Sequence, residues 1–219
     1  MPKTLDAKTQ GSQWLLRSFL QYPRRIGAIA PASQALITEM LRYVPFAHAR
    51  VIVEWGPGTG AITASILARK RPETLYLGLD LHEPFIQHLR ETYQNVPNTL
   101  FLQADFQETP AILHRFHQPR ADALISSLPI SILPEPEKVF QVAALSTRGL
   151  FVQYMYTLAL VKGCWPPRWI RRYFGHHQVR LVLRNLPPTL VFHCFLTPET
   201  LGVLEGERVL ATGLPVIGV

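Results

Sequence analysis

The sequence has only two cysteines, Cys164 and Cys194. They match neither a metal-site spacing nor a small disulfide framework, so a reducing cytosol is the expected environment. The first ten residues, MPKTLDAKTQ, lack the apolar core of a signal peptide. No apolar run approaches the ~18 residues that span a bilayer, and the longest, LFVQYMYTLALV, contains Gln153 and stops at Lys162. We therefore expect a soluble or peripheral protein.

Acidic residues are missing from one long stretch of the chain, because none occurs between Glu137 and Glu199. The basic residues in this stretch are Lys138, Arg148, Lys162, Arg168, Arg171, Arg172, Arg180 and Arg184. A second basic group lies near the N-terminus, and the net charge is +7. Such asymmetry predicts a polyanionic partner, either nucleic acid or an anionic membrane surface, although a basic protein without such a partner stays an alternative.

What the sequence does contain is a regular alternation of short apolar segments with helical segments. Strands are predicted at 51–55, 74–80, 99–105, 121–127 and 149–156, and helices at 62–70, from Pro84, at 109–117 and at 136–146. Apolar strands that alternate with helices of this length predict βαβ units, which build a parallel sheet covered on both faces. The length of 219 residues fits one domain.

The last third of the chain breaks this alternation. Segments 178–186 and 190–196 are predicted strands joined by a short proline-rich turn, which indicates an antiparallel hairpin at one edge. Five parallel strands followed by such a hairpin resemble the class I methyltransferases. The predicted fold is therefore α/β and Rossmann-like, a seven-stranded, mostly parallel sheet with an antiparallel edge hairpin and helices on both faces. We expect N-terminal membrane-interacting helices in residues 1–45, including an extra amphipathic helix and a second helix near 33–43. The methyltransferase core would span 46–198, and 199–219 has no assigned role.

A glycine-rich turn follows the first predicted strand in the segment VEWGPGTG, residues 53–60. It places Gly56, Gly58 and Gly60 at alternate positions, whereas a dinucleotide site has its third glycine one residue later. Glu54 precedes the glycines at the end of the strand, where we expect it to face the ligand. A carboxylate there suits the cationic sulfonium and ammonium of S-adenosylmethionine and would repel a diphosphate.

Two more acids end the next two predicted strands. Asp80, with Leu81 beside it, is placed to accept the ribose hydroxyls of the same cofactor, and Asp105 to accept the adenine amine, with Phe106 covering the ring. Each acid could instead be a solvated strand end or a helix cap. Three acids at successive strand ends together predict S-adenosylmethionine binding, because ligands of such sheets bind at that edge.

The fourth predicted strand ends in SSLPIS, residues 126–131. Amino-group methyltransferases often hold the acceptor amine at this corner, so Ser127 and Pro129 are candidate acceptor contacts. Ile130 stands where an aromatic residue would stack on a nucleobase, which argues against a nucleic-acid substrate. An ordinary proline-containing turn is the alternative.

Several motifs are similar to those of bacterial phosphatidylethanolamine N-methyltransferases: RIGAIAPAS (25–33), EWGPGTGAIT (54–63), SSLP (126–129), VQYMYT (152–157) and RNLPPTLVF (184–192). This resemblance extends from about Trp14 to Phe195, and RNLPPTLVF is its most particular part. It implies successive methylation of phosphatidylethanolamine toward phosphatidylcholine, on the cytoplasmic face of a bacterial membrane. A nucleic-acid methyltransferase related to the rRNA adenine enzymes, or a catalytically silent membrane-binding protein, are the alternatives.

The segment QWLLRSFLQYPRR, residues 13–25, has the composition of an interfacial helix. Phe19 and Tyr22 lie at helical spacing, Trp14 suits the headgroup region, and Arg24 and Arg25 could meet lipid phosphates. The same apolar stripe could instead pack on the sheet or cover the donor site. Arg171 and Arg172 are further candidate lipid contacts. The expected partners are thus an anionic membrane surface and a phospholipid, with no metal and no nucleic acid.

Tyr154 and Tyr156 end the fifth predicted strand on one face. With an ordinary pKa of ~10, tyrosine is a poor base near neutral pH. We expect Tyr156 to orient the acceptor amine, and tyrosine rings to tolerate the methylated cation through cation–π contact. One of the two could simply belong to the core. His176 and His177 are candidate phosphate contacts or bases, although an exposed pair is the more ordinary interpretation.

Overall fold

The computed structural model describes residues 32–161 and 163–197 of the 219-residue chain. The predicted interfacial helix, with Trp14, Phe19, Tyr22, Arg24 and Arg25, lies outside the described residues, as does the segment 199–219. Among the described helices, none has the length and apolar character to cross a bilayer.

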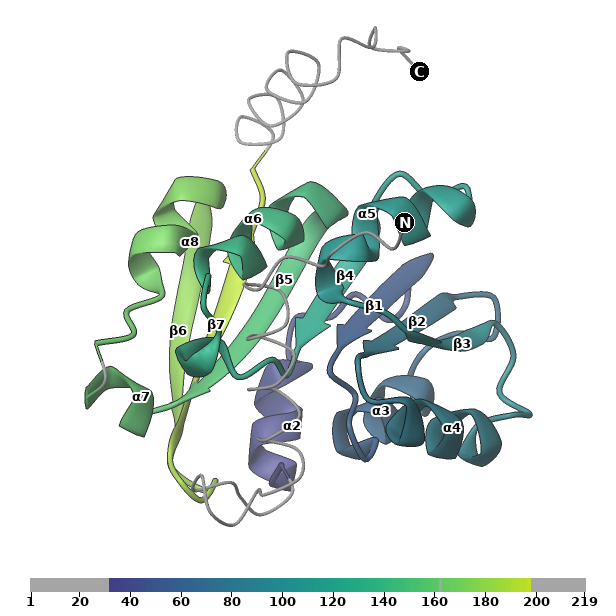
Figure 1. The fold of residues 1–219 in the computed structure, drawn as a ribbon, viewed down its shortest axis with the longest axis horizontal. Coiled ribbons are helices and arrows are strands. Elements are labelled where there is room, and N and C mark those ends of the chain that lie inside the picture. Colours follow the sequence, from purple (N-terminus) through teal and green to yellow (C-terminus); the bar gives the residue numbers. More distant parts are fainter. Residues whose placement is uncertain (1–31, 162, 198–219) are drawn as a thin grey trace, which may run out of the picture.

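The centre of the fold is a seven-stranded sheet in the order β3-β2-β1-β4-β5-β7-β6 (Figure 1). Its strands are β1 (Val51–Trp55), β2 (Leu75–Asp80), β3 (Thr99–Gln103), β4 (Ala121–Ser126), β5 (Thr147–Tyr156), β6 (His176–Val182) and β7 (Thr189–Phe195). The first five strands are parallel, and β7 is antiparallel to both β5 and β6. The predicted fold class is confirmed, including the edge hairpin.

Helices cover both faces of this sheet. One face carries α2 (Gln34–Met40), α3 (Ala61–Leu67) and α4 (Glu83–Thr92), and the other carries α5 (Thr109–Arg115), α6 (Glu137–Ser146) and α8 (Pro167–Tyr173). Short 3₁₀ turns, η1 (Phe106–Glu108) and η2 (Ile130–Ile132), follow β3 and β4, and α7 (Leu158–Val161) follows β5. Helices α7 and α8, the last two in the described part of the chain, are not among the elements predicted from the sequence.

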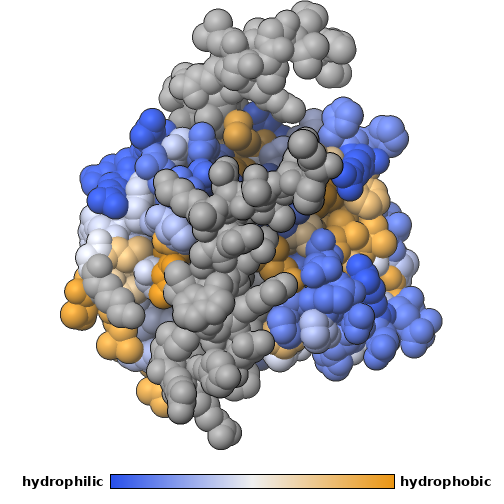
Figure 2. Space-filling model, viewed as in Figure 1, coloured by the Kyte–Doolittle hydropathy of each residue, from blue (hydrophilic) through white to orange (hydrophobic). Residues whose placement is uncertain are grey.

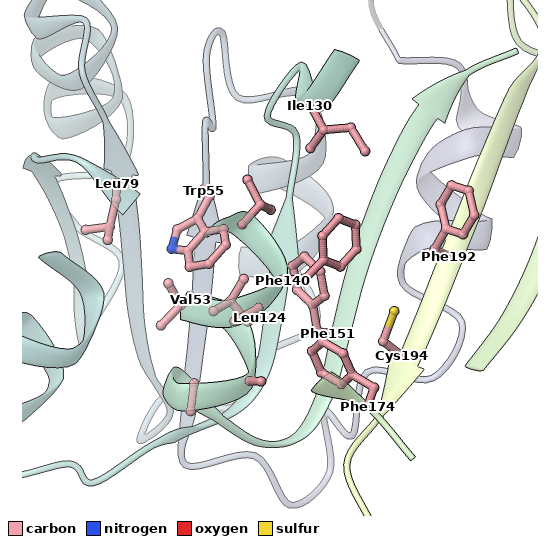
Figure 3. Close-up of a cluster of buried hydrophobic side chains, with 14 of the residues drawn as sticks. Val53, Trp55, Leu79, Leu124, Ile130, Phe140, Phe151, Phe174, Phe192 and Cys194 are labelled. Atoms are coloured by element: carbon pink, nitrogen blue, oxygen red, sulfur yellow. The ribbon is translucent and has the colours of Figure 1, made fainter. Parts of the chain in front are cut away.

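The face beneath α5, α6 and α8 holds an aromatic core (Figure 3). Phe151 stacks on Phe174 with ring centroids 5.7 Å apart, and Phe140 stacks on Trp169 at 5.8 Å. Alternate residues of β1, among them Trp55, point into this layer, so the residues between them point into the other one. Glu54 therefore faces α3, a placement that shapes the site described below.

The predicted second helix is confirmed as α2, and it shares the core of the sheet. Ser33 caps it by accepting a hydrogen bond from the Leu36 amide at 3.2 Å. Leu36 and Met40 are fully buried in the layer that α2 forms with the sheet. The Ser33 amide donates to the side chain of Asn185, which lies in the turn between β6 and β7, at 3.0 Å. This hydrogen bond joins the start of α2 to the turn between β6 and β7, which is distant in the sequence.

Strand direction decides which loops meet at one edge. The carboxyl ends of β1, β2, β4 and β5 lie together because these strands are parallel. The turn between β6 and β7 lies at this edge too, since Val182 pairs with Thr189, and Thr189 pairs with Tyr156. In contrast, the end of α8 leads into the start of β6, at the opposite edge (Figure 1).

Candidate active site

The loop between β1 and α3 carries the three glycines in left-handed backbone conformations. Their φ angles are 68° at Gly56, 53° at Gly58 and 88° at Gly60. L-residues adopt such angles at a cost, so glycine is the residue that permits this turn. The Gly56 amide donates to the Leu79 carbonyl at 2.8 Å, and Gly60 begins α3. The loop therefore curves over the ends of β1 and β2, where Gly56 and Gly58 are partly exposed and Gly60 is buried against Leu89.

Glu54 lies beneath this loop and is fully buried. One carboxylate oxygen accepts hydrogen bonds from the Tyr76 hydroxyl at 2.5 Å and the Thr63 hydroxyl at 2.9 Å. The other oxygen, Oε1, is buried without a partner. Burial raises the pKa of Glu54 to about 7, the nearby charge of Asp80 adds to this, and the two hydrogen bonds oppose it. Glu54 is thus the acid expected at this strand end, but it is buried, and one of its carboxylate oxygens has no hydrogen-bond donor.

Tyr76 and Thr63 are site residues that the sequence motif does not reveal. Tyr76 reaches Glu54 past Gly78, where an added Cβ would lie 3.0 Å from the Tyr76 hydroxyl and 2.8 Å from the Phe101 ring. A larger residue at position 78 would therefore obstruct this hydrogen bond. The signal in the sequence is a glycine inside an otherwise apolar strand, LYLGLD, which is typical of a close approach between neighbouring groups.

Asp80 joins the glycine loop to β2. Its carboxylate accepts from the Gly58 amide at 3.1 Å and from the His82 amide at 2.9 Å, and only 7% of the residue is exposed. Burial raises the pKa of Asp80, whereas the backbone hydrogen bonds lower it. A carboxylate has about four lone-pair sites, so acceptor capacity is left for the predicted ribose hydroxyls. The carbonyl of neighbouring Leu81 accepts from the Gln103 side chain at 3.2 Å.

Asp105 caps η1, which is the alternative that the sequence left open. Its side chain accepts from the Gln107 amide at 2.8 Å, while its own amide donates to Glu108 at 2.9 Å. Phe106 follows and lies 5.2 Å from the Trp55 ring, measured between centroids. Both residues stand at the carboxyl end of β3, so the predicted adenine contacts lie at the edge that holds the glycine loop.

The residues at this edge fit S-adenosylmethionine. Two buried acids, close enough for the charge of Asp80 to raise the pKa of Glu54, form a site that a cation would stabilise. The unpartnered Glu54 oxygen can accept from an ammonium group, and the glycine loop offers room for close backbone approach. Within the described ranges, no group of three His, Cys, Asp or Glu side chains could hold a metal ion.

The corner SSLP lies directly against the glycine loop. The Ser127 amide donates to the Trp55 carbonyl at 2.9 Å, and a Cβ on Gly56 would lie 3.8 Å from the Ser127 Cβ. The Leu128 carbonyl already accepts from the Ile130 amide at 2.9 Å and from Gln153 at 3.0 Å, so both of its lone pairs are used. The Ser127 hydroxyl has no hydrogen-bond partner among the described residues. It is thus a group of this corner that can accept from an amine.

Two neighbours of Ser127 have structural roles. Pro129 begins η2, and Ile130 is only 1% exposed and belongs to the core beneath α6. Position 130 therefore offers no surface on which a flipped nucleobase could stack.

Gln153 holds the SSLP corner in place through a hydrogen bond to Leu128. It was not predicted as a site residue from the sequence. It is fully buried, and its amide nitrogen donates to the carbonyls of Leu128, at 3.0 Å, and Tyr154, at 2.6 Å. Its oxygen is buried without a partner. A glutamine inside the apolar run LFVQYMY is the signal that could have identified it, because buried amides need partners.

Tyr154 and Tyr156 contact each other at the end of β5, with ring centroids 5.6 Å apart and planes at 80°. Their position on one face is confirmed. Burial is the main cause that raises the pKa of each phenol above its ordinary value. Neither group can therefore act as a base near neutral pH, which leaves orientation and cation–π contact as their possible roles.

The structure does not bring Arg171 and Arg172 to this edge. Both lie at the end of α8 and are exposed, and Arg172 forms an ion pair with Glu137 at 2.9 Å. His176 lies at the start of β6, and its ring stacks on that of Phe195 with centroids 5.7 Å apart. These residues are separated from the glycine loop by the length of the strands.

Comparisons with known proteins agree with this geometry. Residues 52–148 match a family model described as a methyltransferase domain. The chain is 30% identical over 184 residues to an ornithine lipid N-methyltransferase from Singulisphaera acidiphila, covering 82% of this chain and 93% of that protein. Among solved structures, it is similar to an O-methyltransferase from Bacillus cereus in complex with SAH, with a TM-score of 0.61 and 12% identity over 90% of this chain and 93% of that one.

A second similar structure is the O-methyltransferase TomG from Streptomyces achromogenes in complex with SAM, with a TM-score of 0.58 and 13% identity over 89% of this chain and 92% of that one. Likeness at such identities concerns the fold, whereas the 30% identical relative, matched along nearly its whole length, concerns the family. The buried acids, the glycine loop and these matches lead to one conclusion: the chain belongs to the class I S-adenosylmethionine-dependent methyltransferases, with S-adenosylmethionine as its cofactor.

Proposed function

We propose that the protein methylates the amine of a membrane lipid, specifically phosphatidylethanolamine and its mono- and dimethyl derivatives, toward phosphatidylcholine. The observation that carries this proposal is the acceptor corner, where the Ser127 hydroxyl is unpartnered among the described residues and lies against the glycine loop. Support also comes from the relative whose name gives it an ornithine lipid as substrate. The corner favours an amine as acceptor, and the name of the relative favours a lipid as the molecule that carries it.

The chemistry requires a neutral amine next to the cofactor. When bound, S-adenosylmethionine supplies an electrophilic methyl group, which the lone pair of the amine takes in line with the bond to sulfur. If the pKa of the amine is near the ~10.4 of lysine, deprotonation at neutral pH costs roughly 4 kcal/mol. Withdrawal of the amine from water lowers that pKa and reduces the cost.

The residues of the corner would position this amine rather than deprotonate it. Ser127 would accept a hydrogen bond from the amine, Gln153 would keep the Leu128 carbonyl and the corner in place, and the Tyr156 ring would face the methylated cation. Most of the rate enhancement would then come from placing donor and acceptor in line.

The experiment that tests the proposal is transfer of labelled methyl from S-adenosylmethionine. Vesicles of phosphatidylethanolamine with anionic lipid, vesicles containing ornithine lipid, and ribosomal RNA are offered in separate reactions. Label in methylated phosphatidylethanolamine is the expected result, and the mono-, di- and trimethyl products count the steps. Label only in ornithine lipid would show that the substrate is that lipid and not phosphatidylethanolamine. Label only in RNA would overturn the lipid proposal.

Variants at the corner refine this test. We expect Ser127→Ala and Tyr156→Leu each to lower kcat by roughly tenfold or more, because the first removes the accepting hydroxyl and the second removes the ring that faces the cation. The dissociation constant of S-adenosylmethionine, measured by calorimetry, should stay within about twofold, because neither side chain holds the donor. A loss of donor binding equal to the loss of rate would instead place these residues in the donor site.

A further inference from the structure

Exposed apolar side chains gather at one corner of the molecule. Of the eight large apolar residues exposed among the described ranges, Leu100 lies on β3 and the other seven lie between residues 158 and 186. We call these seven the apolar corner: Leu158, Val161, Trp165, Val179, Leu181, Leu183 and Leu186. Val161 is 88% exposed and Leu186 is 77% exposed, so these side chains are almost fully in water. Figure 2 shows apolar side chains over this part of the surface, at the lower left where Figure 1 places α7.

The two halves of the apolar corner are joined directly. One half is α7 with the segment after it, and the other is β6 with the turn that leads to β7. At the start of α7, both the amide and the hydroxyl of Thr157 donate to the Pro188 carbonyl at 3.0 Å. The start of α7 and the end of the turn are therefore held next to each other.

This surface adjoins the candidate active site. Thr157 follows Tyr156, the last residue of β5, and the turn between β6 and β7 lies at the same carboxyl edge of the sheet as the glycine loop. A planar partner that rested on the apolar corner would therefore be held at the edge where the acceptor amine must arrive.

The positive charge near the apolar corner favours a partner with a negatively charged surface. Arg184 is exposed within the turn, between Leu183 and Leu186. No acidic residue occurs in the chain from Lys138 to Pro198, the stretch that contains the whole apolar corner. Apolar side chains with a tryptophan and an adjacent arginine are typical of surfaces that insert into the headgroup region of anionic bilayers.

We propose that the apolar corner inserts into the interface of an anionic lipid bilayer and presents the carboxyl edge of the sheet to the lipid headgroups. This inference deepens the proposed function, because it names the surface through which the site reaches its substrate. It places a membrane contact at the C-terminal corner of the sheet, separate from the predicted helix at 13–25.

The experiment measures flotation of the full chain with vesicles of phosphatidylethanolamine and phosphatidylglycerol. The test variant is Val161→Glu with Leu186→Glu, and the matched control is Leu100→Glu, an exposed apolar residue on the strand at the other edge of the sheet. Burial of each such side chain contributes at least about tenfold in affinity. With two such side chains replaced, we expect the double variant to bind at least about a hundredfold more weakly, and the control to bind within about twofold of the wild type.

A second measurement examines insertion itself. Trp165 is 51% exposed, so brominated acyl chains should quench part of the tryptophan fluorescence of the wild type, and less of it in Trp165→Phe. Unfolding curves and donor binding, measured on each variant, establish that the folded site is intact. Methylation of detergent-dispersed lipid at the wild-type rate would do the same for catalysis.

Three results would overturn the inference: no vesicle binding by the wild type, equal binding by the double variant, or a change in oligomeric state in place of a change in vesicle binding. The last result would make the apolar corner an interface between copies of the chain. If no lipid is methylated but vesicle binding still depends on Val161 and Leu186, the inference stands and the proposed function fails.

Discussion

Glu54 is a carboxyl group that the fold holds away from water, with hydrogen bonds to one oxygen only. In the free protein its pKa is about 7, so near neutral pH the group gains or loses a proton readily. A cationic donor beside it favours the ionised form. Donor binding should therefore release protons below neutral pH and become tighter as the pH rises toward about 7.

The raised pKa of Glu54 predicts a pH dependence of stability. The ordinary value is 4.5 and the folded value about 7, so ionisation is more costly in the folded state. The contribution of Glu54 to the stability of the free protein is then greatest below about pH 4.5 and decreases by roughly 3 kcal/mol as the pH rises to about 7. Glu54→Gln cannot ionise and should lack this decrease.

Urea unfolding of wild type and Glu54→Gln at pH 5 and pH 8, without donor, measures this difference. Tyr76→Phe removes a hydrogen bond that lowers the pKa of Glu54, so its transition should move to higher pH. If the free energy of unfolding changed equally between pH 5 and pH 8 in the wild type and in Glu54→Gln, the prediction would be contradicted.

Gly60 and Gly163 make a matched pair for testing the glycine loop. Both have positive φ angles, 88° and 73°, but a Cβ on Gly60 would lie 2.8 Å from the Leu89 side chain, whereas one on Gly163 meets nothing within 4 Å. We expect Gly163→Ala to lower the free energy of unfolding by about 1–2 kcal/mol through backbone strain alone. Gly60→Ala should lower the free energy of unfolding by roughly a further 1–3 kcal/mol, because its Cβ would overpack against Leu89. Equal losses in chemical denaturation would show that Leu89 moves aside freely.

At the scale of elements, the turn between β6 and β7 does more than reverse the chain. Asn185 is 5% exposed, and its side chain accepts from the Ser33 amide at 3.0 Å while donating to Pro187 and to Thr189 at 3.0 and 2.9 Å. The motif RNLPPTLVF thus has a physical basis, since its asparagine joins the turn to the start of α2. The most particular segment of the sequence is therefore a structural junction, and it also contributes Leu186 to the apolar corner.

Removal of this junction should be measurable. We expect Asn185→Ala to lower the free energy of unfolding by about 2–3 kcal/mol, because it leaves the part-buried Ser33 amide without a partner and removes the side-chain hydrogen bonds within the turn. Hydrogen exchange should become faster at the start of α2 as well as in the turn. Arg184→Ala, at the exposed neighbouring position, should stay within about 0.5 kcal/mol of the wild type. A variant at position 185 that matched this control would show that the junction contributes nothing.

The predictable part of the fold was the part with clear periodicity. Apolar strands such as VIVEW and the proline-initiated helix at Pro84 were located within a few residues of β1 and α4. The stretch 157–175 was not, because its aromatic and basic residues have no regular period, and α7 and α8 depend on packing against β5 and α6. Local sequence carries little information of that kind.

The site divides in the same way. Glu54, Asp80 and the glycines follow from a motif, because their spacing along the chain fixes their positions at strand ends. Tyr76 and Gln153 do not, because their contacts depend on which strands are neighbours: Tyr76 reaches Glu54 across the β1–β2 pair, and Gln153 reaches Leu128 across β4–β5. The burial of Glu54 likewise follows from the packing of α3 on the sheet.

At the scale of the whole molecule, the net charge of +7 should make membrane binding sensitive to salt. A basic residue near an anionic leaflet contributes about 1 kcal/mol, and raising the salt from about 0.1 M to about 1 M shortens the Debye length from about 10 Å to about 3 Å. We expect affinity for anionic vesicles to fall by roughly tenfold or more over this range, while a weaker, salt-resistant binding through apolar residues persists.

Sedimentation with anionic and with uncharged vesicles at several salt concentrations checks this expectation. Binding to uncharged vesicles should change little, and donor binding, measured in parallel, serves as the control for the folded state. An affinity for anionic vesicles that is independent of salt would contradict an electrostatic contribution.

The strand order also implies a sequence of events during translation. The strands β1 to β5, which carry the glycine loop, the acids and the SSLP corner, emerge from the ribosome first and can pair with one another. β6 emerges next, but its neighbour in the sheet is β7, which follows it in the chain. The donor-binding edge can therefore assemble before β6 is anchored, and the apolar corner takes its final form only once residues 189–195 have been synthesised and inserted between β5 and β6.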